Sequence, residues 1–155
     1  MHLIKKINYE KKLVISSLAI CLACGVYAQV PVTSSNLPGS IQTSFKGQYP
    51  NVSGSEWRMK DNLYRVNFSQ DGVKQMNSYD ASGKLLSTGT SVKETELPAT
   101  IGSSINSGYA GRSINEIYKI DKNGTPSYWI TLKGSPETKI MYDANGQQIK
   151  DKTNW

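Results

Sequence analysis

One short motif occurs twice in the chain. Residues 79–84 read YDASGK and residues 142–147 read YDANGQ, so the second copy follows the first by 63 positions (142 minus 79). Upstream, a Leu-Pro pair at residues 37–38 recurs at residues 97–98, an offset of 60 (97 minus 37). Two matches in the same order at nearly one offset indicate a tandem repeat of about 60 residues. The units lie at about residues 37–92 and 97–150.

Each unit opens with a helix pattern. Apolar residues recur every fourth position after the first Leu-Pro pair, and proline suits the first position of a helix. The pattern predicts one helix over residues 38–49 and another over residues 98–109. A single apolar stripe on each helix has to pack against a sheet.

Short strands follow each helix, joined by turns such as Asp71-Gly72 that favour hairpins. The predicted strands are residues 56–59, 63–69, 73–79 and 84–92 in the first unit, and 113–120, 127–133, 137–142 and 147–150 in the second. Turns this short allow only antiparallel pairing. We therefore expect an α+β fold of two helix-plus-four-stranded antiparallel meander repeats, with both helices on one face of the sheet. Residues 29–155 would form a single domain, with residues 29–36 as a flexible polar lead.

The N-terminal 28 residues read as a signal peptide, with four lysines ahead of an apolar segment of about 14 residues that is too short to span a membrane. Cleavage after Ala28 predicts an exported protein, periplasmic or extracellular. An alternative is a lipid anchor on Cys24, because residues 22–25 form a partial lipoprotein box. Soluble and anchored forms both stay open.

Removal of the signal changes the composition that matters for function. It takes four of 18 basic and one of 12 acidic residues, which leaves 14 and 11 and a net charge of +3. The remaining basic residues are scattered, so nucleic-acid binding is not expected. The only cysteines and the only histidine also lie in the signal. Disulfides, Cys/His zinc sites and thiol- or histidine-dependent catalysis are therefore excluded from the exported chain.

The Asp-containing turns permit two interpretations. Asp80, Asp143 and Asp121 could supply oxygens to calcium, but each turn carries one acid and lacks the closing glutamate of an EF-hand loop. Asp followed by Gly is also ordinary turn chemistry, which we favour. The repeat-equivalent pair Glu56 and Glu116 could form a glycosidase-like carboxylate pair only if the two came close in a cleft. We expect no cofactor, no metal and no enzymatic activity.

Strand alternation points to a binding surface. If Tyr128 and Ile130 face the helices, then Trp129 points to the other face, where its repeat equivalent is Arg65. Trp and Arg are enriched at binding hot spots. We expect Trp129 and Arg65, then Tyr118, to form a partner-binding surface on an open, helix-free sheet face. Tyr118 can be placed on either face, whereas Trp57 is expected in the core.

The motifs together resemble the PepSY-like family of secreted proteins, which is similar to the β-lactamase inhibitor protein. The resemblance rests on the Leu-Pro pairs, Tyr49-Pro50, the Tyr64-Arg65-Val66 strand and the two repeated turns. It implies tandem helix-plus-sheet repeats, an extracellular or envelope location and no catalysis. The second unit departs from the pattern, because Tyr109 is followed by Ala110 rather than proline.

Two functions of different classes remain. The first is a non-enzymatic binding or inhibitor-like module for a protein or peptide partner. The alternative is an envelope sensor that responds to calcium or a small ligand. The identity of the partner and the oligomeric state do not follow from the sequence.

Overall fold

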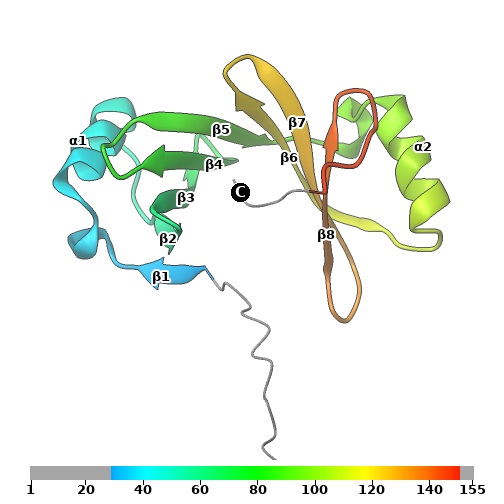
Figure 1. Cartoon of the computed structure of the whole chain (residues 1–155), viewed down its shortest axis with the longest axis horizontal. Coiled ribbons are helices and arrows are strands. Elements are labelled where there is room, and N and C mark those ends of the chain that lie inside the picture. The colour runs from blue at the N-terminus through cyan, green and yellow to red at the C-terminus, as the bar shows by residue number, and fades with distance from the viewer. Residues whose placement is uncertain (1–28, 151–155) are drawn as a thin grey trace, which may run out of the picture.

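The fold is described over residues 29–150 of a computed structural model (Figure 1). The predicted signal peptide at residues 1–28 lies outside the described residues, as do residues 151–155. Within residues 29–150, neither helix has the length and apolar character needed to cross a bilayer.

The elements follow the predicted order closely. The helices are α1 (Gly39–Gln48) and α2 (Ala99–Gly108), with the 3-10 turns η1 (Ser34–Asn36) and η2 (Glu94–Glu96) ahead of them. The strands are β1 (Val30–Val32), β2 (Glu56–Lys60), β3 (Leu63–Gln70), β4 (Val73–Asp80), β5 (Leu85–Ser91), β6 (Ile114–Lys122), β7 (Thr125–Leu132) and β8 (Thr138–Asp143). They form one eight-stranded antiparallel sheet in the order of the chain, because β5 pairs with β6 across the join between the repeats.

Each helix packs its apolar stripe on its own half of the sheet. Ile41 and Phe45 of α1 enter a core with Trp57, and the Phe45 ring meets the Trp57 ring edge-on at 5.2 Å between centroids. Ile101 and Ile105 of α2 enter a second core built on β6–β8. The strand register places both helices on the same face of the continuous sheet, as predicted.

Two expectations at the ends of the fold were wrong. Residues 29–36 are not simply a flexible lead, because Val30–Val32 pair with β2 as an edge strand that tolerates Pro31. Residues 147–150 do not form a fourth strand in the second repeat. They make only a bridge between Tyr142 and Gln148 and a bond from the Ile149 amide to the Met141 carbonyl, at 2.8 Å.

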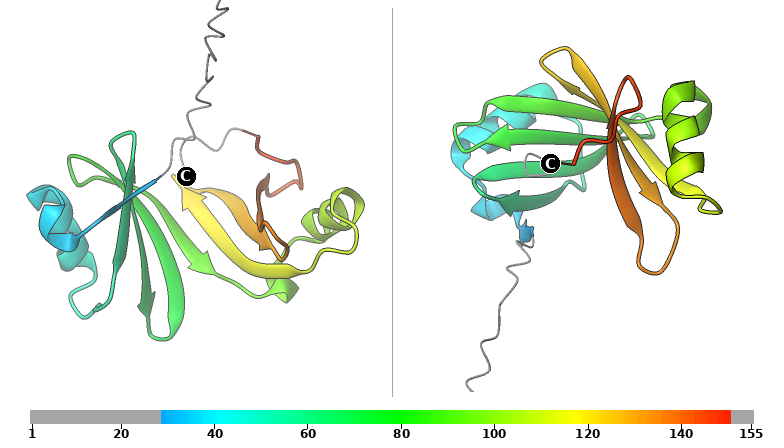
Figure 2. Two further views of the ribbon diagram at one scale, coloured as in Figure 1. Left: turned by 90° about the horizontal axis from the view of Figure 1, so that it is seen from below. Right: turned by 45° about the vertical axis from the view of Figure 1, so that its right-hand side comes forward.

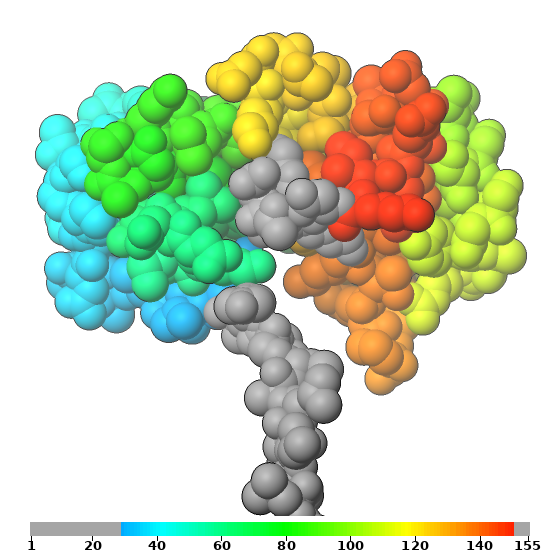
Figure 3. All heavy atoms as spheres, viewed as in Figure 1, coloured from blue at the N-terminus to red at the C-terminus, as the bar shows by residue number. Residues whose placement is uncertain are grey.

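The sheet bends sharply between its halves, so that α1 and α2 lie at opposite ends of the molecule (Figures 1 and 2). In the space-filling view the two repeats form two lobes (Figure 3). Gly89 of β5 pairs with Ile120 of β6, where the two halves join, and a Cβ atom there would stand 2.6 Å from Ile120 Cδ1 and 2.9 Å from the Met76 carbonyl oxygen. The close approach of the neighbouring strands therefore requires glycine at this position.

The repeated YDxxG turn is explained by contacts with the helices. Asp80 Oδ1 accepts bonds from the Ser82 and Lys84 amides at 2.9 and 3.1 Å, and the Ser82 hydroxyl lowers the pKa of this carboxyl. Gly83 has a φ of 85°, and a Cβ there would lie 2.6 Å from the carbonyl oxygen of Ser40 in α1. Gly146, with a φ of 84°, approaches Thr100 of α2 in the same way. Each motif thus packs one end of a hairpin against the helix of the same repeat.

Candidate functional site

The helix-free face folds over itself and encloses a small third core. Its buried members are Met76, Tyr118, Ile120 and Met141, with Trp129 packed against them. They come from β4, β6, β7 and β8, so the bend of the sheet brings together side chains from both repeats. The side chains of this face therefore partly cover one another, and no helix covers the face within residues 29–150.

The structure brings together the two residues that alternation placed on this face. Arg65 Cζ lies 5.6 Å from the centroid of the Trp129 ring, within the range of a cation–π contact. Trp129 is half-buried, and only 7 % of Arg65 is exposed. Tyr118 pairs directly with Trp129 in the register of β6 and β7, which places it on the same face.

Arg65 lacks the partners that a buried guanidinium usually has. Its Nε and Nη2 atoms are buried without a hydrogen-bond partner. The residue opposite it on β2 is a second cation, Arg58. Burial, and then the charge of Arg58, lowers the pKa of Arg65 to about 10. Within residues 29–150, no acid forms an ion pair with this positive charge.

These side chains line one cleft of about 150 Å³ on the helix-free face. The lining residues are Gln29, Arg58, Arg65, Asn67, Met76, Glu116, Tyr118, Trp129, Thr131 and Lys139. The Asn67 side-chain oxygen is also buried without a hydrogen-bond partner. Strand alternation could have identified both Asn67 and Arg58 on this face. Asn67 lies two positions from Arg65 on β3, and Arg58 lies opposite Arg65 on β2. Met76 of β4 lies opposite Asn67 and Glu116 of β6 lies opposite Thr131, and the bend of the sheet brings these two groups into one cleft.

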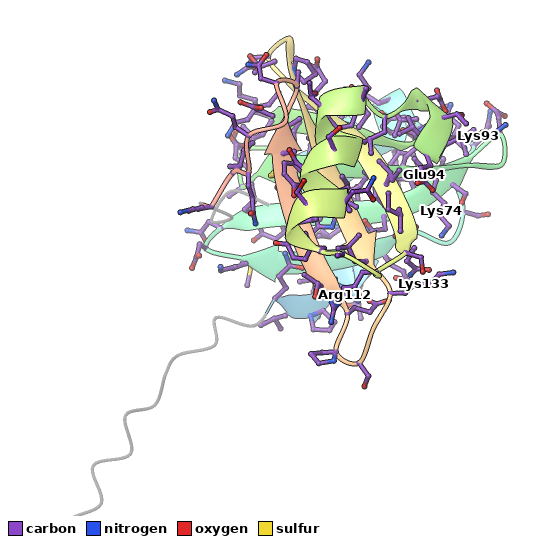
Figure 4. The ribbon with its side chains drawn as sticks, turned by 90° about the vertical axis from the view of Figure 1, so that its right-hand side faces the viewer. Lys74, Lys93, Glu94, Arg112 and Lys133 are labelled. Atoms are coloured by element: carbon purple, nitrogen blue, oxygen red, sulfur yellow. The ribbon has the colours of Figure 1, made fainter. Side chains whose placement is uncertain are left out.

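Glu116, the acid that the described part of the chain contributes to the cleft, already has hydrogen-bond partners. Glu116 Oε1 accepts a bond from Lys74 Nζ at 2.8 Å and one from the Tyr118 hydroxyl at 3.3 Å. Seen from the α2 side, Lys74 lies at the margin of the sheet, to one side of the helix (Figure 4). Burial, with Glu116 nearby, raises the pKa of Tyr118 to about 12. Tyr118 is 8 % exposed, so it forms part of the floor of the cleft.

The remaining candidates are the Glu56/Glu116 carboxylate pair and the aspartates of the repeated turns. Glu56 and Glu116 line a common hollow with Lys74, which binds Glu116. The carboxylates of Asp80 and Asp143 accept bonds within their own turns. No group of three or more His, Cys, Asp and Glu side chains suited to a metal occurs within residues 29–150.

Comparison with solved structures shows the fold of this chain in several bacterial proteins. A protein from Bacteroides eggerthii described as a "putative periplasmic" protein matches with a TM-score of 0.61 at 16% identity, over 74% of this chain and 86% of that one. A DUF2874 family protein from Bacteroides ovatus matches with a TM-score of 0.56 at 23% identity, over 74% and 85%. A BLIP-like protein from Bacteroides fragilis matches with a TM-score of 0.50 at 21% identity, over 75% and 86%.

Sequence comparison gives the family. No curated protein sequence matches the chain at a significant level. A family model described as "putative beta-lactamase-inhibitor-like, PepSY-like" matches twice, over residues 26–87 and 78–150. The two matches correspond to the two repeats and together span most of the chain, so the resemblance carried by the sequence motifs is confirmed. The chain belongs to the PepSY-like family.

Proposed function

We propose that this protein is an exported, non-enzymatic binding module that engages a protein or peptide partner through its helix-free face. Trp129 and Arg65 are the contact residues, and Tyr118, which lies beside Trp129 in the strand register, supports the Trp129 ring. Residues 29–155 act as one domain after removal of the signal peptide. The BLIP-like description of one structural neighbour and the periplasmic description of another agree with this proposal.

The observation that carries the proposal is the state of Arg65. A charged side chain that is 93% buried (100 minus 7) and lacks partners for two nitrogens weakens the fold. Such a cost is typical of binding sites, where a ligand completes the interactions. Trp129 stacks beside the guanidinium, and an aromatic ring paired with arginine is a common hot-spot arrangement.

A capture experiment tests the proposal. The bait is the chain from Gln29 to Trp155, applied to an envelope fraction of the source cells, with Trp129→Ala and Lys119→Ala as parallel baits. Lys119 is exposed on the strand that carries Tyr118, but on the opposite face. A partner that is retained by the wild type and Lys119→Ala but lost by Trp129→Ala supports the helix-free face. Equal retention by all three baits contradicts it.

A second candidate function is recognition of a small apolar ligand. A hollow of about 500 Å³ lies between η1, α1 and β2, lined in part by Phe45, Tyr49 and Trp57. This volume is in the range of small-molecule sites. Thermal melts against a panel of lipophilic compounds test this candidate. Stabilisation that is lost on Gln42→Trp, at the margin of the hollow, would favour it over the partner-binding function.

A further inference from the structure

The cleft around Arg65 contains buried polar atoms that lack hydrogen-bond partners. Two guanidinium nitrogens of Arg65 need acceptors, and the side-chain oxygen of Asn67 needs a donor. The two residues stand two positions apart on β3 and therefore point to the same face, about 7 Å apart along the strand. An occupant that satisfies both must carry acceptor oxygens at one end and an N–H group at the other.

The charges around the cleft favour an anionic occupant. Arg58 lies opposite Arg65 in the register and also lines the cleft. Among residues 29–150, Glu116 is the only acid in the lining, and its carboxylate already binds Lys74 and the Tyr118 hydroxyl. Within these residues, an incoming anion thus meets Arg65 without displacing an ion pair of its guanidinium.

The size and shape of the cleft select the kind of anion. A volume of about 150 Å³ is below the roughly 300–1,000 Å³ of pockets that bind whole small molecules, so the cleft has room for a single side chain. The Trp129 ring lies against the guanidinium, with its centroid 5.6 Å from Arg65 Cζ, so an occupant reaches the N–H groups from another side. A carboxylate matches this planar fork with two parallel hydrogen bonds.

We infer that the cleft receives an aspartate or glutamate side chain of the partner, with its carboxylate on Arg65 and a backbone N–H of the same segment on Asn67. This inference rests on the proposed function, because it specifies what the partner presents to the helix-free face. The occupant is an acidic residue in a peptide segment of another protein. The segment completes the hydrogen bonds of Arg65 and Asn67 and excludes water around them.

The test is an NMR titration that needs no identified partner. The Nε–Hε resonance of Arg65, assigned by its loss in Arg65→Lys, is followed in the chain from Gln29 to Trp155. The probes are N-acetyl-glutamate N-methylamide and its uncharged match, N-acetyl-glutamine N-methylamide, at constant ionic strength. The control resonance is that of Arg112, which binds Thr138 and does not line the cleft.

The expected result is a saturable shift of the Arg65 resonance with the glutamate probe and at least about ten-fold weaker binding of the glutamine probe. Asn67→Leu should weaken the glutamate probe while the chain stays folded. Equal shifts with both probes, or an equal shift at Arg112, would overturn the inference. The titration is repeated on a chain that ends at Lys150, because Asp151 also carries a carboxylate. Binding by the shorter chain alone would overturn the assignment to a partner.

The outcomes separate this inference from the proposed function. If a partner is captured through Trp129 but the Arg65 resonance responds to neither probe, the proposed binding function stands. The inference that the partner presents an acidic side chain is then wrong. If the Arg65 resonance responds selectively to the glutamate probe but no partner is captured, the carboxylate site is supported. The proposed binding of a protein partner is then not supported.

Discussion

Arg65 and Trp129 are repeat equivalents, and they contact each other across three intervening strands. In a flat sheet, β3 and β7 would lie about 19 Å apart, four strand spacings of about 4.8 Å. The Arg65 guanidinium is nevertheless 5.6 Å from the Trp129 ring centroid. The bend that closes this distance turns two copies of one strand into the two walls of a single cleft. The binding surface therefore belongs to the tandem repeat and to neither unit alone.

Arg65→Met should raise the stability of the free protein. The substitution keeps most of the side-chain volume and removes a buried charge without hydrogen-bond partners at Nε and Nη2. We expect the free energy of unfolding to rise by about 1–3 kcal/mol. Urea denaturation measures this, with Lys133→Met as the control, because Lys133 is exposed, lies outside the cleft lining and should change stability little. A stability loss comparable to that of a core truncation would show that Arg65 is satisfied in solution.

The advantage of Arg65→Met should shrink at high pH. The pKa of Arg65 is lowered to about 10 in the folded chain, from an ordinary 12.5. Below pH 10 the folded and unfolded wild type both carry the proton, so the full penalty is present. As pH rises through 10, the folded state releases its proton first and the wild type gains relative stability. Between about pH 8 and pH 11 the difference should fall by about 1 kcal/mol. Tyr79 and Tyr118, whose pKa values burial raises to about 12, destabilise both chains alike in this range.

Gly83→Ala should cost more than the same change in an open turn. Gly83 and Gly72 have similar φ values of 85° and 77°, but only Gly83 lies against another element, the Ser40 backbone. Gly72→Ala should cost about 1 kcal/mol from backbone strain alone, whereas Gly83→Ala should cost about 2 kcal/mol or more, since α1 has to move. Thermal melts of the two variants measure the difference, and equal losses would show that the turn does not press on the helix.

Gly89→Ala tests the bend of the sheet. A methyl group there meets Ile120 and the Met76 carbonyl, so the strands on the helix-free face must separate. We expect a loss of about 1–3 kcal/mol and a weaker contact between Arg65 and Trp129. Gly102→Ala, in α2 with nothing near its Cβ position, should instead stabilise by roughly 0.5–1 kcal/mol. Trp129 fluorescence, measured in a background that carries both Trp57→Phe and Trp155→Phe, reports the contact. An unchanged spectrum would contradict the role of Gly89.

Calcium should leave the melting temperature unchanged. The Asp80 and Asp143 carboxylates accept hydrogen bonds from amides two and four positions further on, which is how an aspartate closes a turn. A thermal melt in calcium against a chelator measures the effect. A clear upward shift that is abolished by Asp80→Asn and Asp143→Asn would revive the calcium-responsive alternative.

Much of the architecture follows from the sequence because the repeat supplies it twice. The helices, most strands and the placement of Trp129 and Arg65 on the helix-free face come from periodicity and from Leu-Pro and Asp-Gly signals. The prediction for residues 147–150 was wrong because their counterparts in β5 pair with both β4 and β6, whereas within residues 29–150 no further strand follows β8. β1 was missed because its three residues contain a proline.

The cleft itself could not be predicted from alternation. Alternation assigns a face to Arg65 and Trp129 but not the distance between them, which depends on the bend at Gly89. The burial of Arg65 beside Arg58, without an acid bound to it, is equally a consequence of tertiary packing. A charged residue in a strand is ordinarily taken as solvated, and here the fold closes over it.

The affinity of the captured partner for matched variants tests the central claim most directly. Titration calorimetry compares the wild type with Trp129→Ala, Arg65→Gln and Lys119→Ala, each first checked for a cooperative melt. If the helix-free cleft is the binding surface, the first two variants should weaken binding by about 30-fold or more, and Lys119→Ala by less than about two-fold. Wild-type affinity in both Trp129→Ala and Arg65→Gln would contradict the account and move the search to another surface.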